Sequence, residues 1–226
     1  RLATPDGEYG CAAIMEVETG EIKAMSNLKR LSDGSYAEGE NYVTNGHYRC
    51  EPGSTFKIAS AVVALEKGVV DTAKIIDTGN GSWPFYGRTM HDSHANGKIS
   101  FNRAIQQSSN IAMAKVIDNA FKDKPEKYIE ALYDLGLCMP LGLEIPGAKP
   151  AHIKHPTDKG AHGWYKTSLP WIAHGYETDM PPIQILTFYN TLANGGKMVR
   201  PHLIRAEMHN GKVVKSYGTE VLKSSI

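Results

Sequence analysis

The stretch Cys50-Glu51-Pro52-Gly53-Ser54-Thr55-Phe56-Lys57 begins an apolar run that closes at Glu66-Lys67-Gly68. Pro and Gly at the start and Gly just past the end are typical of a helix and its boundaries, so the run predicts a buried helix. Lys57 stands one turn into this helix, although the helix is otherwise apolar on nearly all sides. A charged residue in that position needs an explanation.

Ser54 and Lys57 are three residues apart, which places both side chains on one helical face, within hydrogen-bonding reach of each other. A serine hydroxyl becomes a good nucleophile when a neighbouring base removes its proton, and burial can lower the pKa of a lysine until it acts as that base. The helix start also favours the negative charge that develops on attack. In an isolated Ser-x-x-Lys, however, the serine is more often a helix cap and the lysine reaches water.

A second motif, Ser108-Ser109-Asn110, lies between two apolar helical stretches within Phe101 to Ala120. A Ser-x-Asn on a short turn can aim a hydroxyl and an amide into one cleft, to relay a proton and to hold a substrate amide. Alone the motif is weak, because Ser and Asn are ordinary helix caps. Together with Ser-x-x-Lys, it makes two of the three motifs shared by β-lactamases and penicillin-binding proteins.

The residues from Glu51 to Lys57 closely resemble the nucleophile motif of class B penicillin-binding proteins, in which Glu-Pro-Gly-Ser-Thr-Phe-Lys is typical. Six further stretches resemble this family in order and spacing: Ala12 to Met25, Asp92 to Ser100, Ser108 to Ala112, Leu135 to Pro146, Gly175-Tyr176 with Pro181 to Gln184, and Asn194 to Pro201. The resemblance covers almost the whole chain. It implies that Ser54 is the nucleophile, Lys57 its base, Ser108 a proton relay and Asn110 a ligand of the substrate amide.

The resemblance implies a mixed α and β (α+β) fold, that of penicillin-binding protein transpeptidases and serine β-lactamases. In that fold an antiparallel sheet is flanked by helices, and a cleft separates it from an all-helical lobe. The local patterns agree with this class. They predict strands at Ala12 to Val17 and Ile22 to Met25, helices at Phe101 to Ala120, from Pro125 and at Pro182 to Leu192, a hairpin at Asn210-Gly211, and loops at Asn27 to Arg49 and Pro146 to His162.

One departure from the family concerns its third motif, a Lys-Thr-Gly or Lys-Ser-Gly on the strand that edges the cleft. The chain ends at Ser224-Ser225-Ile226 without it. We therefore expect residues 1–226 to form a truncated transpeptidase domain whose C-terminal strands are missing. Such a domain lacks one oxyanion donor and the strand that binds the substrate carboxylate, so its activity should be impaired. Lys166-Thr167-Ser168 precedes Gly175-Tyr176 and ends in Ser rather than Gly, so it is interpreted as a loop.

The activity that the resemblance implies is that of a peptidoglycan D,D-transpeptidase. Ser54 would form an acyl-enzyme with the D-Ala-D-Ala end of a stem peptide, an amine of a neighbouring stem would resolve it, and β-lactam antibiotics would acylate the same serine. The location implied is the periplasmic face of the bacterial cytoplasmic membrane, with an anchor absent from this chain and with divisome or elongasome membrane proteins as partners. Two alternatives stay open: a serine β-lactamase, and a non-catalytic sensor of β-lactams or muropeptides.

The amino-acid composition argues against several other classes of function. Lys and Arg total 25 against 24 for Asp and Glu, so no sequence-wide field favours nucleic acid. No apolar stretch approaches the roughly 18 to 20 residues of a membrane span. Neither the three cysteines nor His91-Asp92 with His94 show a metal-ligand spacing, so we expect no metal and no cofactor.

Two aromatic groups leave their role open. Large side chains of this kind could line a groove for a glycan or peptide, or could anchor loops to the core. They are Trp83, Phe85 and Tyr86 in one group, and Trp164, Tyr165 and Trp171 in the other.

Overall fold

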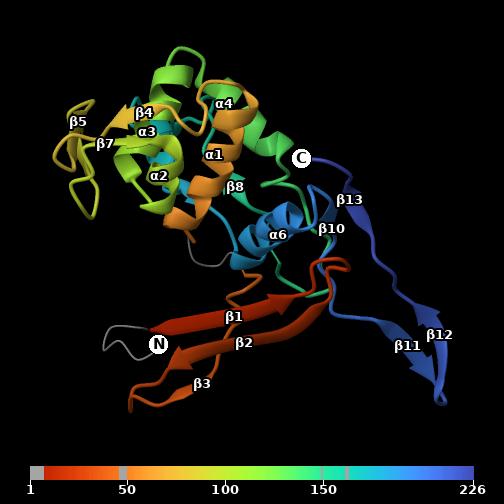
Figure 1. Cartoon of the computed structure of the whole chain (residues 1–226). Helices are drawn as coiled ribbons and strands as arrows, with labels where there is room; N and C mark the ends of the chain where they lie inside the picture. Colours follow the sequence, from red (N-terminus) through yellow and green to blue (C-terminus); the bar gives the residue numbers. More distant parts are fainter. Residues whose placement is uncertain (1–7, 46–49, 149, 161–162) are drawn as a thin grey trace. The chain divides into compact units, whose positions relative to one another are not determined.

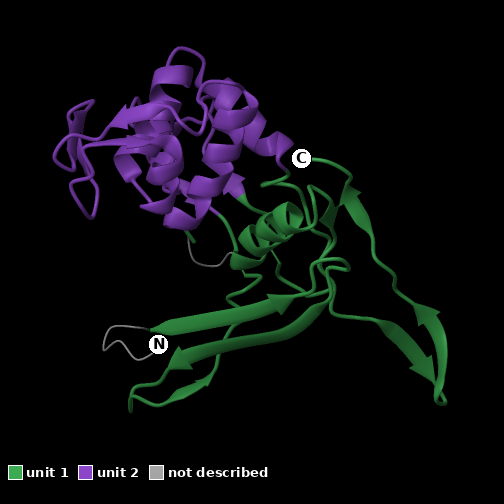
Figure 2. Cartoon of the chain, in the orientation of Figure 1, with its two compact units in different colours: residues 1–50, 136–151, 180–226 green, residues 51–135, 152–179 purple. Residues whose placement is uncertain are grey.

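The computed structural model describes residues 8–45, 50–148, 150–160 and 163–226, so the ends of the loops expected at Asn27 to Arg49 and Pro146 to His162 fall partly outside them (Figure 1). The chain divides into two compact units, coloured green and purple in Figure 2. The first comprises residues 1–50, 136–151 and 180–226, and the second comprises residues 51–135 and 152–179. Each unit therefore assembles segments that are distant in sequence.

The first unit is built on an antiparallel sheet with the strand order β1-β2-β3. Its strands are β1 (Tyr9–Met15), β2 (Ile22–Arg30) and β3 (Tyr36–Glu38). The apolar residues of β1 and β2 pack with the buried side chains of Val43, Leu141 and Ile183. The unit also contains helix α6 (Pro182–Ala193), the pair β10 (Met198–Val199) and β13 (Val221–Lys223), and the hairpin of β11 (Ala206–His209) and β12 (Lys212–Ser216).

The second unit holds the motifs singled out in the sequence. Its helices are the 3-10 helix η1 (Gly53–Phe56), α1 (Lys57–Glu66), α2 (Phe101–Gln106), α3 (Asn110–Phe121), α4 (Pro125–Asp134) and α5 (Ser168–Ile172). Three short antiparallel pairs accompany them: β4 (Ile75–Asp77) with β7 (Lys98–Ser100), β5 (Ser82–Phe85) with β6 (Arg88–His91), and β8 (His152–Ile153) with β9 (Thr178–Asp179). Fully buried side chains such as Phe56, Phe101, Ile111 and Tyr128 form its core.

Several local predictions need correction. The stretch from Asn27 to Arg49, expected as a loop, contains the end of β2 and all of β3. By contrast, the break between α2 and α3 lies where the sequence predicts a turn, at Ser108-Ser109-Asn110 between two helical stretches. Ser168, expected in a loop, begins α5. Strand β3 pairs with the nearby end of β2, whereas α5 contacts α3, a partner distant in the chain that periodicity within a short window does not report.

In the part of the chain that the structure describes, no helix is both long enough and apolar enough to cross a bilayer. The longest of the helices named above, α3 and α6, have 12 residues each.

A buried hydroxyl relay holds α1 in the second unit. Ser60 Oγ donates a hydrogen bond to the carbonyl oxygen of Ala173 (2.8 Å) and lies 2.7 Å from Tyr128 Oη. Since a carbonyl oxygen can only accept, the Ser60 proton serves Ala173, and the Tyr128 hydroxyl donates to Ser60. Both side chains are fully buried, so neither group has water as an alternative partner.

We predict that Ser60→Ala lowers the free energy of unfolding by about 2 kcal/mol, because it strands a buried phenol and a buried carbonyl. Adding Tyr128→Phe should recover part of that loss, since it removes the stranded phenol. Urea denaturation of both single variants and the double variant measures the coupling. A double variant whose loss equals the sum of the two single losses would contradict the relay.

Candidate active site

Ser54 lies in the 3-10 turn η1, which runs directly into α1. The preceding Gly53 has φ +55°, a conformation that side chains disfavour. The backbone N–H of Gly53 donates to the carbonyl oxygen of Gly175 at 3.0 Å. The turn that presents Ser54 is therefore fixed on one side by a segment more than a hundred residues further along the chain.

Lys57 has only 3% of its surface exposed, although it carries an amine. Its Nζ lies 3.0 Å from Ser54 Oγ, 2.9 Å from Ser108 Oγ and 2.6 Å from the Ser108 carbonyl oxygen. The sequence prediction that these three side chains meet is thus confirmed as geometry. Every hydrogen-bonding direction of the amine has a partner, which is how a buried amine is tolerated.

Burial lowers the pKa of Lys57 to about 8, and the nearby charge of Asp92 opposes this shift. About a tenth of the lysine is therefore neutral at pH 7, far more than for a lysine with an ordinary pKa. A neutral amine has two N–H groups, which suit the two oxygens of Ser108, and one lone pair, which is left for the proton of Ser54. The arrangement can generate a nucleophilic oxygen at Ser54.

The Ser108 turn adopts an unfavourable backbone and is held in it by Asp92. Ser108 has φ +52°, which is uncommon for a residue other than glycine. Asp92 Oδ2 accepts a hydrogen bond from Ser109 Oγ (2.6 Å), and its Oδ1 accepts from the Ile111 N–H (3.0 Å). Ser109 Oγ also accepts from Ala112 N–H and so caps α3.

Asn110, the fourth residue singled out in the sequence, makes no hydrogen bond to Ser54, Lys57 or Ser108 within the described residues. Its Nδ2 donates to the carbonyl oxygen of His91 at 2.8 Å. This bond fixes the orientation of the amide and leaves Oδ1 without a partner among the described residues. A substrate N–H could therefore be received there.

Sequence reasoning missed His174, which borders this site. The side chain is 2% exposed, and neither ring nitrogen has a hydrogen-bond partner among the described residues. Burial and then the charge of Lys57 lower the pKa of His174 to about 4, so the ring is neutral at neutral pH. It packs edge to face against Trp171 and Tyr176, with centroids 5.2 and 5.0 Å away. The only signal in the sequence was the neighbouring Gly175-Tyr176 motif.

Nothing in the described ranges brings together three or more His, Cys, Asp or Glu side chains in a way that could hold a metal ion. In the His91-Asp92 stretch, both carboxylate oxygens of Asp92 are engaged in bracing the Ser108 turn.

Comparison with known protein families matches residues 10–226 to the penicillin binding protein transpeptidase domain. Among curated proteins, a probable peptidoglycan D,D-transpeptidase FtsI of Caulobacter vibrioides is 29% identical over 210 residues, which cover 89% of this chain and 33% of that protein. The probable peptidoglycan D,D-transpeptidase PbpC of Pseudomonas aeruginosa is 26% identical over 204 residues, covering 89% of this chain and 35% of that protein. The chain thus spans about a third of these relatives.

Solved structures confirm the fold. Penicillin-binding protein 2B from Streptococcus pneumoniae superposes with a TM-score of 0.76 at 18% identity, over 96% of this chain and 37% of that one. Penicillin-binding protein 3 from Mycobacterium tuberculosis, complexed with aztreonam, gives a TM-score of 0.74 at 22% identity, over 96% of this chain and 48% of that one. The mixed α and β fold expected from the sequence is the fold of these proteins.

We predict that Gly175→Ala lowers the free energy of unfolding by about 3 kcal/mol or more, because the new methyl group is both strained and obstructed. Gly175 has φ +88°, and its Cβ would stand 2.1 Å from the carbonyl oxygen of Gly53. The matched control is Gly79→Ala, at φ +60° with no atom within 4 Å, which should cost only the conformational strain of about 1 to 2 kcal/mol. Equal losses in thermal denaturation would refute the close contact.

Proposed function

Because this chain belongs to the penicillin-binding protein transpeptidase domain family, of the class B type, we propose that it is the catalytic domain of a peptidoglycan D,D-transpeptidase. The observation that carries the proposal is the buried Lys57 amine 3.0 Å from Ser54 Oγ, at the start of a helix. A serine and a lysine in this relation suit acyl transfer through a covalent intermediate. The family match spans parts of both compact units, which supports treating them as one transpeptidase domain.

In the proposed reaction, Lys57 takes the proton of Ser54 while Oγ attacks the carbonyl of the penultimate D-Ala of a stem peptide. The C–N bond to the last D-Ala then breaks, and Ser108 Oγ relays the proton from Lys57 to the leaving amine. The Ser108 hydroxyl is suited to this relay because it lies 2.9 Å from Lys57 Nζ. Asn110 Oδ1 accepts a hydrogen bond from the substrate backbone.

The second half of the proposed reaction reverses these roles. An amine of a neighbouring stem peptide attacks the ester on Ser54, loses its proton to Lys57, and leaves the two stems joined by a new amide bond while Ser54 regains its proton. β-Lactams acylate the same serine. The reaction belongs outside the cytoplasmic membrane, where stem peptides lie, and membrane proteins of the division or elongation machinery are the proposed partners.

We predict that Ser54→Ala abolishes covalent labelling by a fluorescent penicillin while the free energy of unfolding changes by no more than about 1 kcal/mol. The reason is that the substitution removes the nucleophile but little packing. Intact mass spectrometry after incubation with penicillin is the measurement. Thr55→Ala, which deletes the neighbouring hydroxyl, should keep the label. A labelled Ser54→Ala protein would show that another residue is the nucleophile.

We also predict that the acylation rate of the unsubstituted protein rises about tenfold per pH unit up to the Lys57 pKa of about 8 and then levels off. The sign follows from the mechanism, since only the neutral amine can take the proton of Ser54. Stopped-flow acylation by a chromogenic cephalosporin between pH 5.5 and 9.5 measures it. Lys57→Arg should be about 10² to 10⁴ times slower and lose the rise, because a guanidinium stays charged. A flat profile for the unsubstituted protein would exclude Lys57 as the base.

A further inference from the structure

The second unit contains a cavity of about 820 Å³ whose use the proposed reaction does not explain. Three aromatic side chains line it, those of Tyr86, Tyr165 and Trp171, together with the cations Arg88 and Lys166 and the carboxylate of Glu177. The two aromatic groups of the sequence therefore divide their roles. Trp83 and Phe85 pack against the buried core, whereas Tyr86 and Tyr165 face the cavity.

The cavity has an excess of positive charge. Glu177 is already paired, since its Oε2 accepts from Lys154 Nζ at 2.6 Å, and Lys154 in turn lies over the Tyr165 ring. By contrast, neither Arg88 nor Lys166 has an ion-pair partner in the described part of the chain. The cavity thus presents two uncompensated cations beside aromatic surface, which suits an anionic group carried on an organic chain.

Two connections place this cavity next to the candidate active site. The segment that includes Trp171 and Glu177 also forms hydrogen bonds to the turn before Ser54. The Gly53 N–H donates to the Gly175 carbonyl oxygen (3.0 Å), and the Glu177 N–H donates to Glu51 Oε1 (2.9 Å). On the other side, strand β6 runs from Arg88 to His91, whose carbonyl holds Asn110. Three residues of strand span about 10 Å, so Arg88 lies about that far from His91, the residue that Asn110 contacts.

Backbone strain gathers at the same place. Among described residues other than glycine, positive φ occurs at Tyr86 (+42°), Ser108 (+52°), Glu177 (+54°) and Asn210 (+48°). Asn210 lies in the β11–β12 turn, where that conformation is ordinary. The other three line either the cavity or the candidate site, and strain of this kind persists where surrounding contacts hold it for function. Tyr86 is held by a hydrogen bond of its hydroxyl to the buried carboxylate of Asp118 (3.2 Å).

We propose that this cavity binds a carboxylate of the acyl-donor peptide, on a residue about three positions before the carbonyl that Ser54 attacks. An extended peptide covers about 3.3 to 3.6 Å per residue, so three residues span about the length of strand between Arg88 and His91, which holds Asn110. Arg88 and Lys166 pair with the carboxylate, and the three aromatic rings cover the chain that carries it. The identity of the substrate in this inference rests on the proposed function, whereas the existence of an anion site does not.

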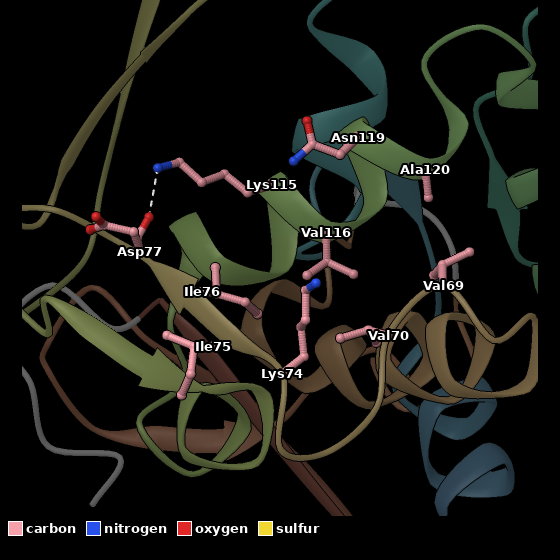
Figure 3. Close-up of a pocket in the computed structure, with 10 residues that line it drawn as sticks. All are labelled: Val69, Val70, Lys74, Ile75, Ile76, Asp77, Lys115, Val116, Asn119 and Ala120. Carbon is pink, nitrogen blue, oxygen red and sulfur yellow. Dashed lines mark hydrogen bonds between the residues drawn. The ribbon is translucent and has the colours of Figure 1, made fainter.

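A second cavity supplies the control. It has a volume of about 410 Å³ and is lined by Lys74, Lys115 and mainly apolar side chains (Figure 3). Lys115 Nζ is engaged there with the carbonyl oxygen of Asp77 at 2.7 Å. Lys74 lines a cavity of the same unit without lining the proposed subsite, so Lys74→Gln removes one positive charge elsewhere.

The test compares two acetylated peptides, Glu-Ala-Ala-D-Ala-D-Ala and Gln-Ala-Ala-D-Ala-D-Ala, which differ only in one charge. Binding is measured by isothermal titration calorimetry on the Ser54→Ala protein, so that turnover is not required. We expect the Glu peptide to bind about threefold to fivefold tighter than the Gln peptide, because Arg88 and Lys166 are exposed and ion pairs at exposed sites are weak. The double substitution Arg88→Gln and Lys166→Gln should abolish this preference, and Lys74→Gln should keep it.

Equal affinities of the two peptides, or a preference that survives in the double variant, would overturn the subsite. A separate measurement keeps the proposed function distinct. With Ser54 intact, penicillin acylation of the Lys74→Gln protein should stay within about twofold of the unsubstituted rate, because Lys74 lines neither the proposed subsite nor the candidate active site. Absence of acylation in both proteins would contradict the proposed function and leave the calorimetric result on the cavity standing.

Discussion

The geometry of the candidate active site depends on the buried amine of Lys57. A buried amine is tolerated only when its hydrogen-bonding directions are filled, and here the partners come from residues 3 and 51 positions away in the chain. Filling them requires Ser108 to take a strained backbone, which in turn requires a brace from Asp92. The arrangement of Ser54, Ser108 and Asp92 therefore follows from the need to provide hydrogen-bond partners for one buried nitrogen.

What the sequence revealed was local. Ser54 and Lys57 were found because a fixed helical spacing brings them together, and Ser108 because a short motif sits between two apolar runs. The helices that begin at Pro125 and Pro182, and the turn at Asn210-Gly211, follow from residues with strong conformational preferences of their own. In each case a window of a few residues contains the whole physical cause.

The features that the sequence did not reveal depend on contacts between residues far apart in the chain. His174 and Asp92 acquire their importance from neighbours brought in by folding: His174 from Trp171, Tyr176 and the nearby lysine, and Asp92 from the cap of α3. Helix α5 has only five residues, which is too few for a helical pattern of apolar residues to be recognised in the sequence. The division of the aromatic residues between core and cavity is likewise a property of packing, and residue type alone left it open.

The helical stretch from Gly53 to Ser60, which carries Ser54, is held by two hydrogen bonds to one short segment, residues 173 to 175. Gly53 bonds to Gly175 ahead of the reactive pair, and Ser60 bonds to Ala173 behind it. Both hydrogen bonds use backbone carbonyl oxygens of this segment, so the bond at residue 173 does not depend on which side chain that residue carries. Residue 175 is restricted by contrast, because a Cβ there would stand 2.1 Å from the carbonyl oxygen of Gly53. The position of Ser54 is therefore set by a segment that contributes none of the groups bonded to the Lys57 amine.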